Sequence, residues 1–547
     1  MKKNILLFVI IAIAVFLRFY QLSSNPPSLT WDEAAWGYNA YSLGLDGKDE
    51  FGKFLPITYL ESFGDFKPPV YAYLSVLPVK LFGLTEFSTR FASAFFGILT
   101  IIFTFLLVKK IFPSFDSKFQ IATALLSAFL LAISPWHILL SRAAFEANVA
   151  TFFIVCGVYL FLSALENNRW MLVLSLFSFV VSMYTFNTAR IVVPLLLFGL
   201  IVANWKFLLF KMKFQVVISI LISGFLFLPL FLFLLTPQAR LRFKEVNIFS
   251  DISVINRTNQ EIQNDGNSTL SKLLHNRRFV YGVEYLRHYF DNLNPQFLFI
   301  KGDGNPKFSI QDVGQLYIWE IPFFLVGIFL LFRKREGNWW ILPYWLFIGI
   351  IPAASARETP HALRIETIIP TMQILTAYGL YYVISNTKFR ILKFGIKNVL
   401  IVGVFVAAIF NFLYFYHNYF VHYPREFSGE WQYGYKDAVS FMEEKSSFYD
   451  RIVVTESLGR PYIYTLFYTK YSPEKFRQEA VIEREALGFV HVKKYSKFVF
   501  AKNVSMEVKK DIKSLYIDTP DAVPNDAHIV EKFKLLNGNI AFVAYDY

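Results

Sequence analysis

Long apolar runs separated by short polar connectors dominate the first 416 residues of the chain. An apolar run of about 20 residues is long enough for a helix to cross a bilayer. We therefore expect a polytopic α-helical membrane protein with about eleven transmembrane helices. They are predicted at 4–20, 87–108, 119–136, 148–165, 170–186, 191–205, 214–235, 316–332, 339–354, 367–384 and 398–416.

The first run follows Met1-Lys2-Lys3, but no small-residue cleavage site follows it, so we interpret it as an uncleaved first span. The run at 69–83 is shorter and contains Pro78 and Lys80, which favours a helix in the membrane interface. If that run crossed the membrane, Lys109-Lys110 and every later basic connector would fall on the outer side. An interfacial helix avoids this conflict with the positive-inside rule.

Basic residues gather in every second connector, that is, on one side of the membrane. This pattern predicts a cytoplasmic N-terminus and an outward-facing C-terminus in the cell membrane. These connectors hold Lys109, Lys110 and Lys118; Arg169; Lys206, Lys211 and Lys213; Arg333, Lys334 and Arg335; and Lys388, Arg390, Lys393 and Lys397. The outer loops then include 21–86 and 236–315. The second becomes amphipathic around 279–290, so we expect it to lie on the membrane as a cover.

The composition becomes that of a soluble protein after the last span. A helix is predicted at 435–444, with strands at 451–455, 497–501 and 540–545. We therefore expect two domains: a transmembrane module at 1–420, whose outer loop 21–86 is catalytic, and a small extracytoplasmic α/β domain at 421–547.

Composition agrees with a membrane protein, since 55% of residues are hydrophobic, only 17% are charged and the mean hydropathy is +0.41. The net charge of +13 would suggest nucleic-acid binding in a soluble chain. Here the excess charge lies in membrane connectors, so no nucleic-acid partner is expected. The single cysteine, Cys156, lies in an apolar run and excludes a disulfide framework or a cysteine-based metal site.

Two polar clusters in the outer loop 21–86 are the leading candidates for chemistry. Asp32-Glu33 follows the first span closely, where charge is costly to keep near hydrocarbon. About thirty residues later comes Asp65-Phe66-Lys67-Pro68-Pro69. Together the clusters offer a base and a cation, with Asp32 as the base and Lys67 on a donor phosphate.

Further charged residues are predicted on the same face: Arg142 with Glu146, and Arg357, His361 and Arg364. This mixture suits group transfer from a membrane-embedded phosphate ester, because the leaving phosphate needs cations and the incoming hydroxyl needs a carboxylate. Phosphate leaves readily without a general acid. One carboxylate is therefore sufficient for an inverting displacement.

Each cluster also has a structural interpretation. Thr30 or Asp32 would cap a helix at 33–43, with Glu33 favoured at its positive end. Lys67 would anchor the chain at lipid headgroups. The remaining charges would form local ion pairs: Arg142 with Glu146, and the 357–364 cluster with Glu358 and Glu366.

Asp32-Glu33, Asp65-Phe66-Lys67-Pro68-Pro69 and the segment Glu86-Phe-Ser-Thr-Arg90-Phe-Ala-Ser-Ala resemble the GT-C membrane glycosyltransferases. The bacterial relatives of protein O-mannosyltransferases and of the lipid A aminoarabinose transferase are the most similar. The resemblance implies that Asp32 is the catalytic aspartate, Glu33 its acidic partner and Lys67 the carrier-phosphate ligand. Glu146 takes the place of a second acidic residue, although its motif, Phe-Glu-Ala-Asn, departs from the mannosyltransferase form.

The resemblance implies a hexosyl or pentosyl transferase that uses a polyprenyl-phosphate sugar as donor. Its acceptor would be a glycan, a lipid or a protein, and Asp65, Arg142 and Glu146 would support the site or bind that acceptor. Some relatives hold a divalent metal near the site, but no full ligand set is visible in this sequence, so metal dependence stays open. A flippase of lipid-linked saccharides is the alternative, although its spans would carry more charge. A non-catalytic assembly factor would leave the outer clusters unexplained.

Overall fold

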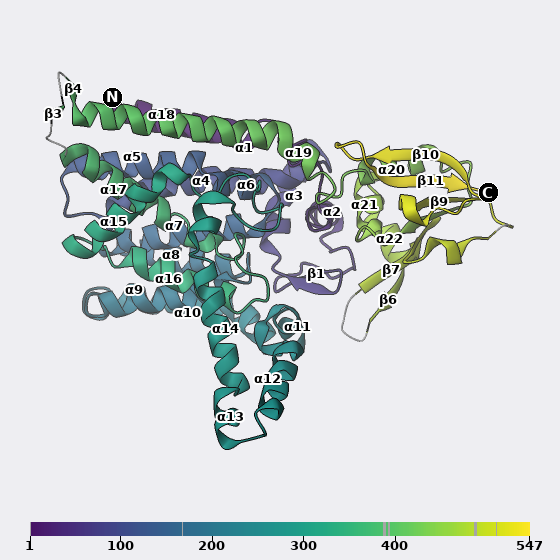
Figure 1. The fold of residues 1–547 in the computed structure, drawn as a ribbon, viewed down its shortest axis with the longest axis horizontal. Coiled ribbons are helices and arrows are strands. Elements are labelled where there is room, and N and C mark those ends of the chain that lie inside the picture. Colours follow the sequence, from purple (N-terminus) through teal and green to yellow (C-terminus); the bar gives the residue numbers. More distant parts are fainter. Residues whose placement is uncertain (1, 167, 387–389, 392–393, 486–489, 510) are drawn as a thin grey trace. The chain divides into compact units, whose positions relative to one another are not determined.

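The computed structural model describes residues 2–166, 168–386, 390–391, 394–485, 490–509 and 511–547. The chain forms two compact units, each built from separate segments (Figure 1). Unit 1 contains Met1–Leu17, Phe96–Leu140 and Ala147–Phe415, and unit 2 contains Arg18–Phe95, Ser141–Glu146 and Tyr416–Tyr547. Lys388 and Lys393 of the last predicted basic connector lie outside the described residues.

Every predicted span coincides with a helix. They are α1 (Lys2–Phe19), α4 (Glu86–Ile111), α5 (Ser117–Ile133), α7 (Glu146–Glu166), α8 (Met171–Met183), α9 (Ala189–Lys211), α10 (Lys213–Leu234), α15 (Ile321–Lys334), α16 (Ile341–Ala354), α17 (Thr371–Asn386) and α18 (Ile396–His417). Within the described residues, five helices are long and apolar enough to cross a membrane. Counting the bent pair α5 and α6 (Pro135–Arg142) as one span gives six. The chain is a multi-pass membrane protein, and the count of eleven spans stays a prediction.

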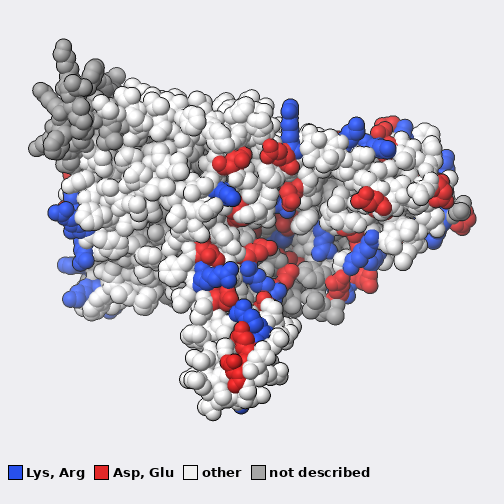
Figure 2. Space-filling model, in the orientation of Figure 1, with Lys and Arg blue, Asp and Glu red and all other residues white. Residues whose placement is uncertain are grey.

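Three of the predicted basic connectors meet at one end of unit 1. The amide of Asn338, after α15, donates to the main-chain oxygen of Lys110 at 3.0 Å. Lys110, near the end of α4, also pairs with Glu166 at the end of α7. Lys334 lies 4.8 Å from the ring of Tyr382 in α17. Figure 2 shows Lys and Arg gathered at the left-hand end of unit 1, beside a broad surface without charge.

The segment 236–315, which was predicted to be an outer loop, contains a helical arm that projects from the rest of unit 1 (Figure 1). It contains α11 (Pro237–Val246), α12 (Ile252–Asn264), α13 (Thr269–Leu274) and α14 (Arg277–Asp291). Apolar side chains of α13 and α14 are exposed, including Leu273, Phe279 and Phe290. Its role as a cover stays a prediction.

Unit 2 combines the predicted outer loop, within Arg18–Phe95, with the C-terminal segment Tyr416–Tyr547. Its helices are α2 (Trp31–Asp46), α3 (Val70–Phe82), α19 (Tyr423–Glu426), α20 (Tyr435–Glu444), α21 (Pro461–Tyr468) and α22 (Pro473–Glu479). Its strands are β1 (Leu60–Ser62), β2 (Asp65–Lys67), β5 (Arg451–Thr455), β6 (Val481–Arg484), β7 (Val490–Tyr495), β8 (Phe498–Ala501), β9 (Ser514–Asp518), β10 (His528–Lys534) and β11 (Ile540–Asp546). In unit 1, β3 (Arg390–Ile391) pairs with β4 (Phe394–Gly395).

The C-terminal sheet has the strand order β10-β11-β9-β5-β8-β7-β6. Its central strand β5 runs parallel to both β8 and β9, and the other neighbours are antiparallel. The predicted helix at 435–444 and the strands at 451–455, 497–501 and 540–545 are confirmed as α20, β5, β8 and β11. The C-terminal part is therefore an α/β domain with a mixed sheet.

The core of this sheet extends into α2. Ala34 and Tyr38 of α2 belong to the same buried cluster as Val454 of β5 and Phe467 of α21. The Tyr38 hydroxyl also donates to the main-chain oxygen of Tyr471 at 3.0 Å. Because α2 is packed into this core, the residues at its start have a fixed position.

Candidate active site

Helix α2 places the acidic pair at its first turn. Thr30 is the N-cap residue: its side-chain oxygen accepts a hydrogen bond from the Glu33 amide at 3.3 Å. In return the Glu33 carboxylate accepts from the Thr30 amide at 2.9 Å, which completes a capping box. Of the two residues considered as the cap, Thr30 therefore takes that position and Asp32 lies in the first turn.

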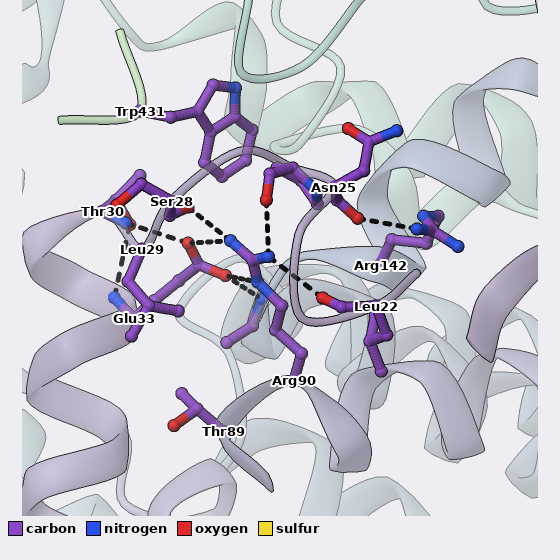
Figure 3. A network of polar contacts seen from close by, with 12 residues as sticks. Leu22, Asn25, Ser28, Leu29, Thr30, Glu33, Thr89, Arg90, Arg142 and Trp431 are labelled. Carbon is purple, nitrogen blue, oxygen red and sulfur yellow. Dashed lines mark hydrogen bonds and ion pairs between the residues drawn. The ribbon is translucent and has the colours of Figure 1, made fainter. Parts of the chain in front are cut away.

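The Glu33 carboxylate is buried at the centre of a polar network (Figure 3). It accepts from Nε of Arg90 at 2.9 Å, from Nη2 of Arg90 at 3.2 Å and from the amide of Ala144 at 2.9 Å. Both side chains of the ion pair are almost inaccessible to solvent. Glu33 thus connects α2 to the start of α4 and to the segment that precedes α7.

Arg90 and Arg142 hold the segment that leads into α2. Arg90 donates to the main-chain oxygens of Pro26 at 2.8 Å, Leu22 at 3.2 Å and Ser28. Arg142 donates to the main-chain oxygen of Asn25 at 2.7 Å (Figure 3). It also donates to the hydroxyl of Tyr419 at 3.1 Å. The two buried guanidinium groups therefore fix the path of residues 22–28.

Asp32 and Lys67, which are 35 residues apart, form an ion pair. Lys67 is the last residue of β2, opposite Leu60 in the β1–β2 hairpin. Its ammonium lies 5.1 Å from the ring centroid of Phe63 and 5.4 Å from that of Trp36. The Lys67 side chain is 11% exposed, whereas that of Asp32 is 50% exposed. The pair thus joins a largely buried cation to a carboxylate that solvent can reach.

Other carboxylates surround this cation. Asp65 and Glu146 are both close enough to interact electrostatically with Lys67. Burial acts to lower the pKa of Lys67, but attraction to Asp32 and Asp65 outweighs it and raises the pKa above its ordinary value. Lys67 is therefore a permanent positive charge at neutral pH.

Glu50 is a buried acid beside this cluster that the sequence reasoning did not single out. The main-chain amide of Glu50 donates to the side-chain oxygen of Asn39, in α2, at 2.9 Å. The Glu50 carboxyl accepts from the side-chain nitrogen of Asn39 at 3.3 Å. Burial raises the pKa of the Glu50 carboxyl to about 8. Between its ordinary pKa and about pH 8, Glu50 is thus protonated in the folded protein but ionised in the unfolded chain.

Replacing Glu50 with Gln is expected to flatten the pH dependence of stability. Because the folded pKa is raised, the stability contributed by protonated Glu50 is present at low pH and decreases as the pH rises through about 8. The unfolding temperatures of the two proteins should therefore diverge, in favour of Glu50→Gln, between about pH 5 and pH 9. The exposed Glu444→Gln is the control, and parallel curves for wild type and Glu50→Gln would contradict the assignment.

Arg357, His361 and Arg364 lie in unit 1, in the connection that follows α16. Glu358 lies 3.9 Å from His361 and 3.8 Å from Arg364, as expected for a salt-bridged turn. Arg357 donates to the main-chain oxygen of Asn247 at 3.3 Å. The assignment of these three residues to a donor phosphate stays a prediction.

No group of three or more His, Cys, Asp or Glu side chains is arranged to hold a metal ion within the part of the chain that the structure describes.

Arg90 was missed as a site residue, although its sequence context carried a signal. It lies near the start of a run that is otherwise apolar, and a charge in such a run usually serves a structural or functional purpose. The sequence did not show that its partner is Glu33.

Known proteins of similar sequence include a family of transferases and an uncharacterised relative. Residues 8–246 match the family described as dolichyl-phosphate-mannose-protein mannosyltransferase. An uncharacterised protein of Aquifex aeolicus (strain VF5) is 32% identical over 162 residues, and the match covers 29% of this chain and 29% of that protein.

The crystal structure of ArnT from Cupriavidus metallidurans in the apo state matches with a TM-score of 0.57 and 12% identity, covering 100% of this chain and 98% of ArnT. The structure of the same protein bound to undecaprenyl phosphate matches with a TM-score of 0.55 and 13% identity, covering 99% and 97%. The resemblance to the GT-C membrane glycosyltransferases is thus confirmed: the chain has their fold along its whole length, and its first part matches the protein mannosyltransferase family.

Proposed function

We propose that this protein is an integral-membrane glycosyltransferase. It moves a hexosyl or pentosyl group from a polyprenyl-phosphate sugar to an acceptor hydroxyl at the outer membrane face. The observation that carries the proposal is the ion pair between the half-exposed Asp32 and the buried Lys67. This pair supplies a proton acceptor and a phosphate ligand, the two groups that the transfer requires.

In the proposed reaction, the Asp32 carboxylate accepts the proton of the acceptor hydroxyl. The acceptor oxygen forms a bond to the anomeric carbon, and the bond from that carbon to the phosphate oxygen breaks. Polyprenyl phosphate leaves with the electron pair, and the Lys67 ammonium stabilises its negative charge. A single displacement inverts the configuration at the anomeric carbon.

The remaining predicted residues support these two. Glu33 acts as a positioning residue, because its carboxylate is fully occupied by Arg90, Thr30 and Ala144. We assign Asp65, Arg142 and Glu146 to supporting or acceptor-binding roles.

The fold and the apolar helices support a polyprenyl-phosphate donor. The fold is that of ArnT, which has been crystallised with undecaprenyl phosphate, and an isoprenoid phosphate suits a chain rich in apolar helices. In the proposed orientation the N-terminus is cytoplasmic and the C-terminal domain is extracytoplasmic, since the basic connectors then face the cytoplasm. Arg357, His361 and Arg364 would add cations for the donor phosphate.

The proposal is tested by incubating the purified protein with a panel of radiolabelled polyprenyl-phosphate sugars and membrane extract. The label is then followed into glycan, lipid and protein fractions. We expect transfer in detergent solution, where no two sides of a membrane exist. Transport of lipid-linked saccharide across proteoliposomes without transfer would favour the flippase alternative and overturn the proposal.

Replacing Lys67 with Met is expected to weaken use of the donor. The substitution removes the phosphate ligand but keeps the length of an apolar side chain that packs on Phe63 and Trp36. A charge-assisted contact is worth about 1.5–3 kcal/mol, so kcat/KM for the donor should fall by about 10- to 100-fold. Lys67→Arg should keep more activity than Lys67→Met, and equal activities for the two variants would contradict the phosphate role.

A further inference from the structure

A cavity lies in unit 2, in the C-terminal α/β domain. It has a volume of about 380 Å³ and is lined by Glu456, Ser457, Gly459, Arg460, His491 and Lys502. This volume lies within the range of about 300–1,000 Å³ that is typical of small-molecule sites. None of these residues belongs to the candidate active site described above.

The sheet topology brings the lining residues together. Glu456 to Arg460 connect β5 to α21, and Lys502 follows β8, whose Ala501 pairs with Thr455 at the end of β5. Since β7 is antiparallel to β8, its first residues, including His491, reach the same edge. The cavity thus lies at the carboxyl ends of two parallel strands, where α/β folds commonly bind ligands.

The loop that forms the cavity packs directly on the start of α2. A Cβ atom added to Gly459 would lie 2.7 Å from Cε3 of Trp31, so the loop approaches the indole as only glycine allows. The guanidinium of Arg460 lies 5.7 Å from the ring centroid of Phe63, the same ring that the Lys67 ammonium contacts at 5.1 Å. The cavity is therefore a neighbour of Asp32 and Lys67.

The cavity lining has groups that could bind both the anionic group and the hydroxyls of an anionic sugar. Arg460 and Lys502 are cations, and a guanidinium matches the oxygens of a phosphate or a carboxylate. The Glu456 side chain is 11% exposed, and among the described residues its Oε2 is buried with no hydrogen-bond partner. A buried carboxylate oxygen without a donor is unusual, and a ligand hydroxyl would satisfy it.

We propose that this cavity is an acceptor subsite that binds a saccharide carrying an anionic group, either phosphate or carboxylate. Arg460 and Lys502 bind the anion and Glu456 accepts a hydrogen bond from a sugar hydroxyl. This inference rests on the proposed glycosyltransferase function, in which the acceptor has to be held beside Asp32.

Calorimetric titration of the full-length protein in detergent tests the proposal. The ligands are glucose 6-phosphate, glucuronate, glucose and inorganic phosphate, which separate the anion from the sugar. We expect both anionic sugars to bind at least tenfold more tightly than glucose or inorganic phosphate. Arg460→Gln and Glu456→Gln should each weaken that binding at least tenfold, with unchanged unfolding temperatures. Lys532→Ala, on the exposed face of β10, is the control and should bind as wild type does.

The proposal is overturned if the anionic sugars bind no more tightly than glucose, or if Arg460→Gln binds them as wild type does. Binding requires no donor, so this outcome is independent of the transfer assay. In that assay Arg460→Gln should raise the KM for an anionic acceptor with kcat retained. Absence of transfer by the wild-type protein would instead count against the proposed function.

Discussion

Asp32→Asn is expected to lose almost all sugar transfer while the protein stays folded. General-base catalysis typically contributes about 10²–10⁴-fold to a rate, and an amide cannot accept the proton of the acceptor hydroxyl. The loss should appear in kcat, because Lys67 still binds the donor phosphate. The fold should survive, because the cap of α2 is Thr30 and the Asp32 side chain is half exposed.

Asp46→Asn is the matched control for this variant. Asp46 ends the same helix and is also paired with a basic side chain, Arg477, but it belongs to no proposed catalytic group. Transfer rates of the two variants are compared with one polyprenyl-phosphate sugar, together with their unfolding temperatures. If Asp32→Asn kept more than about one tenth of the wild-type kcat, Asp32 would not be the base.

The helical part of the fold was predictable because its signal is local. Each apolar run was long enough to identify a helix without knowledge of its neighbours. In the C-terminal domain, the short apolar runs at 451–455 and 540–545 likewise predicted strands that the structure confirms as β5 and β11. The hairpin β6–β7 was not predicted. Strand β6 is exposed along its length, so its sequence does not show the apolar positions that a buried face would require.

The residue types of the candidate site could be predicted from the sequence, but the contacts between those residues could not. An acidic pair and a lysine near a membrane boundary indicated Asp32 and Lys67, since charge there is costly without a purpose. That Glu33 pairs with Arg90 depends on tertiary packing between segments 57 residues apart. Likewise, no local pattern showed that α2 shares a core with α21.

Removing Arg90 is expected to have the largest effect on stability. Arg90→Gln leaves the Glu33 carboxylate buried without its cation, and breaking a buried pair in this way costs about 3–5 kcal/mol. The main-chain oxygens of Leu22 and Pro26 also lose their donor, so the segment leading to Asp32 should loosen. Unfolding in mixed micelles should show the loss of stability, and transfer should fall with it.

A double-mutant cycle separates the ion pair from these other contacts. Glu33→Gln removes the negative charge, so the double variant Glu33→Gln with Arg90→Gln leaves no buried charge unpaired. The double variant should be more stable than the sum of the losses of the two single variants predicts, by about 0.5–3 kcal/mol in the free energy of unfolding. Lys493→Met, which breaks an exposed pair with Glu483, is the control and should cost less than about 1 kcal/mol. Strict additivity of the two single losses would show that Glu33 and Arg90 act independently, and Asp32 would then need another explanation for its fixed position.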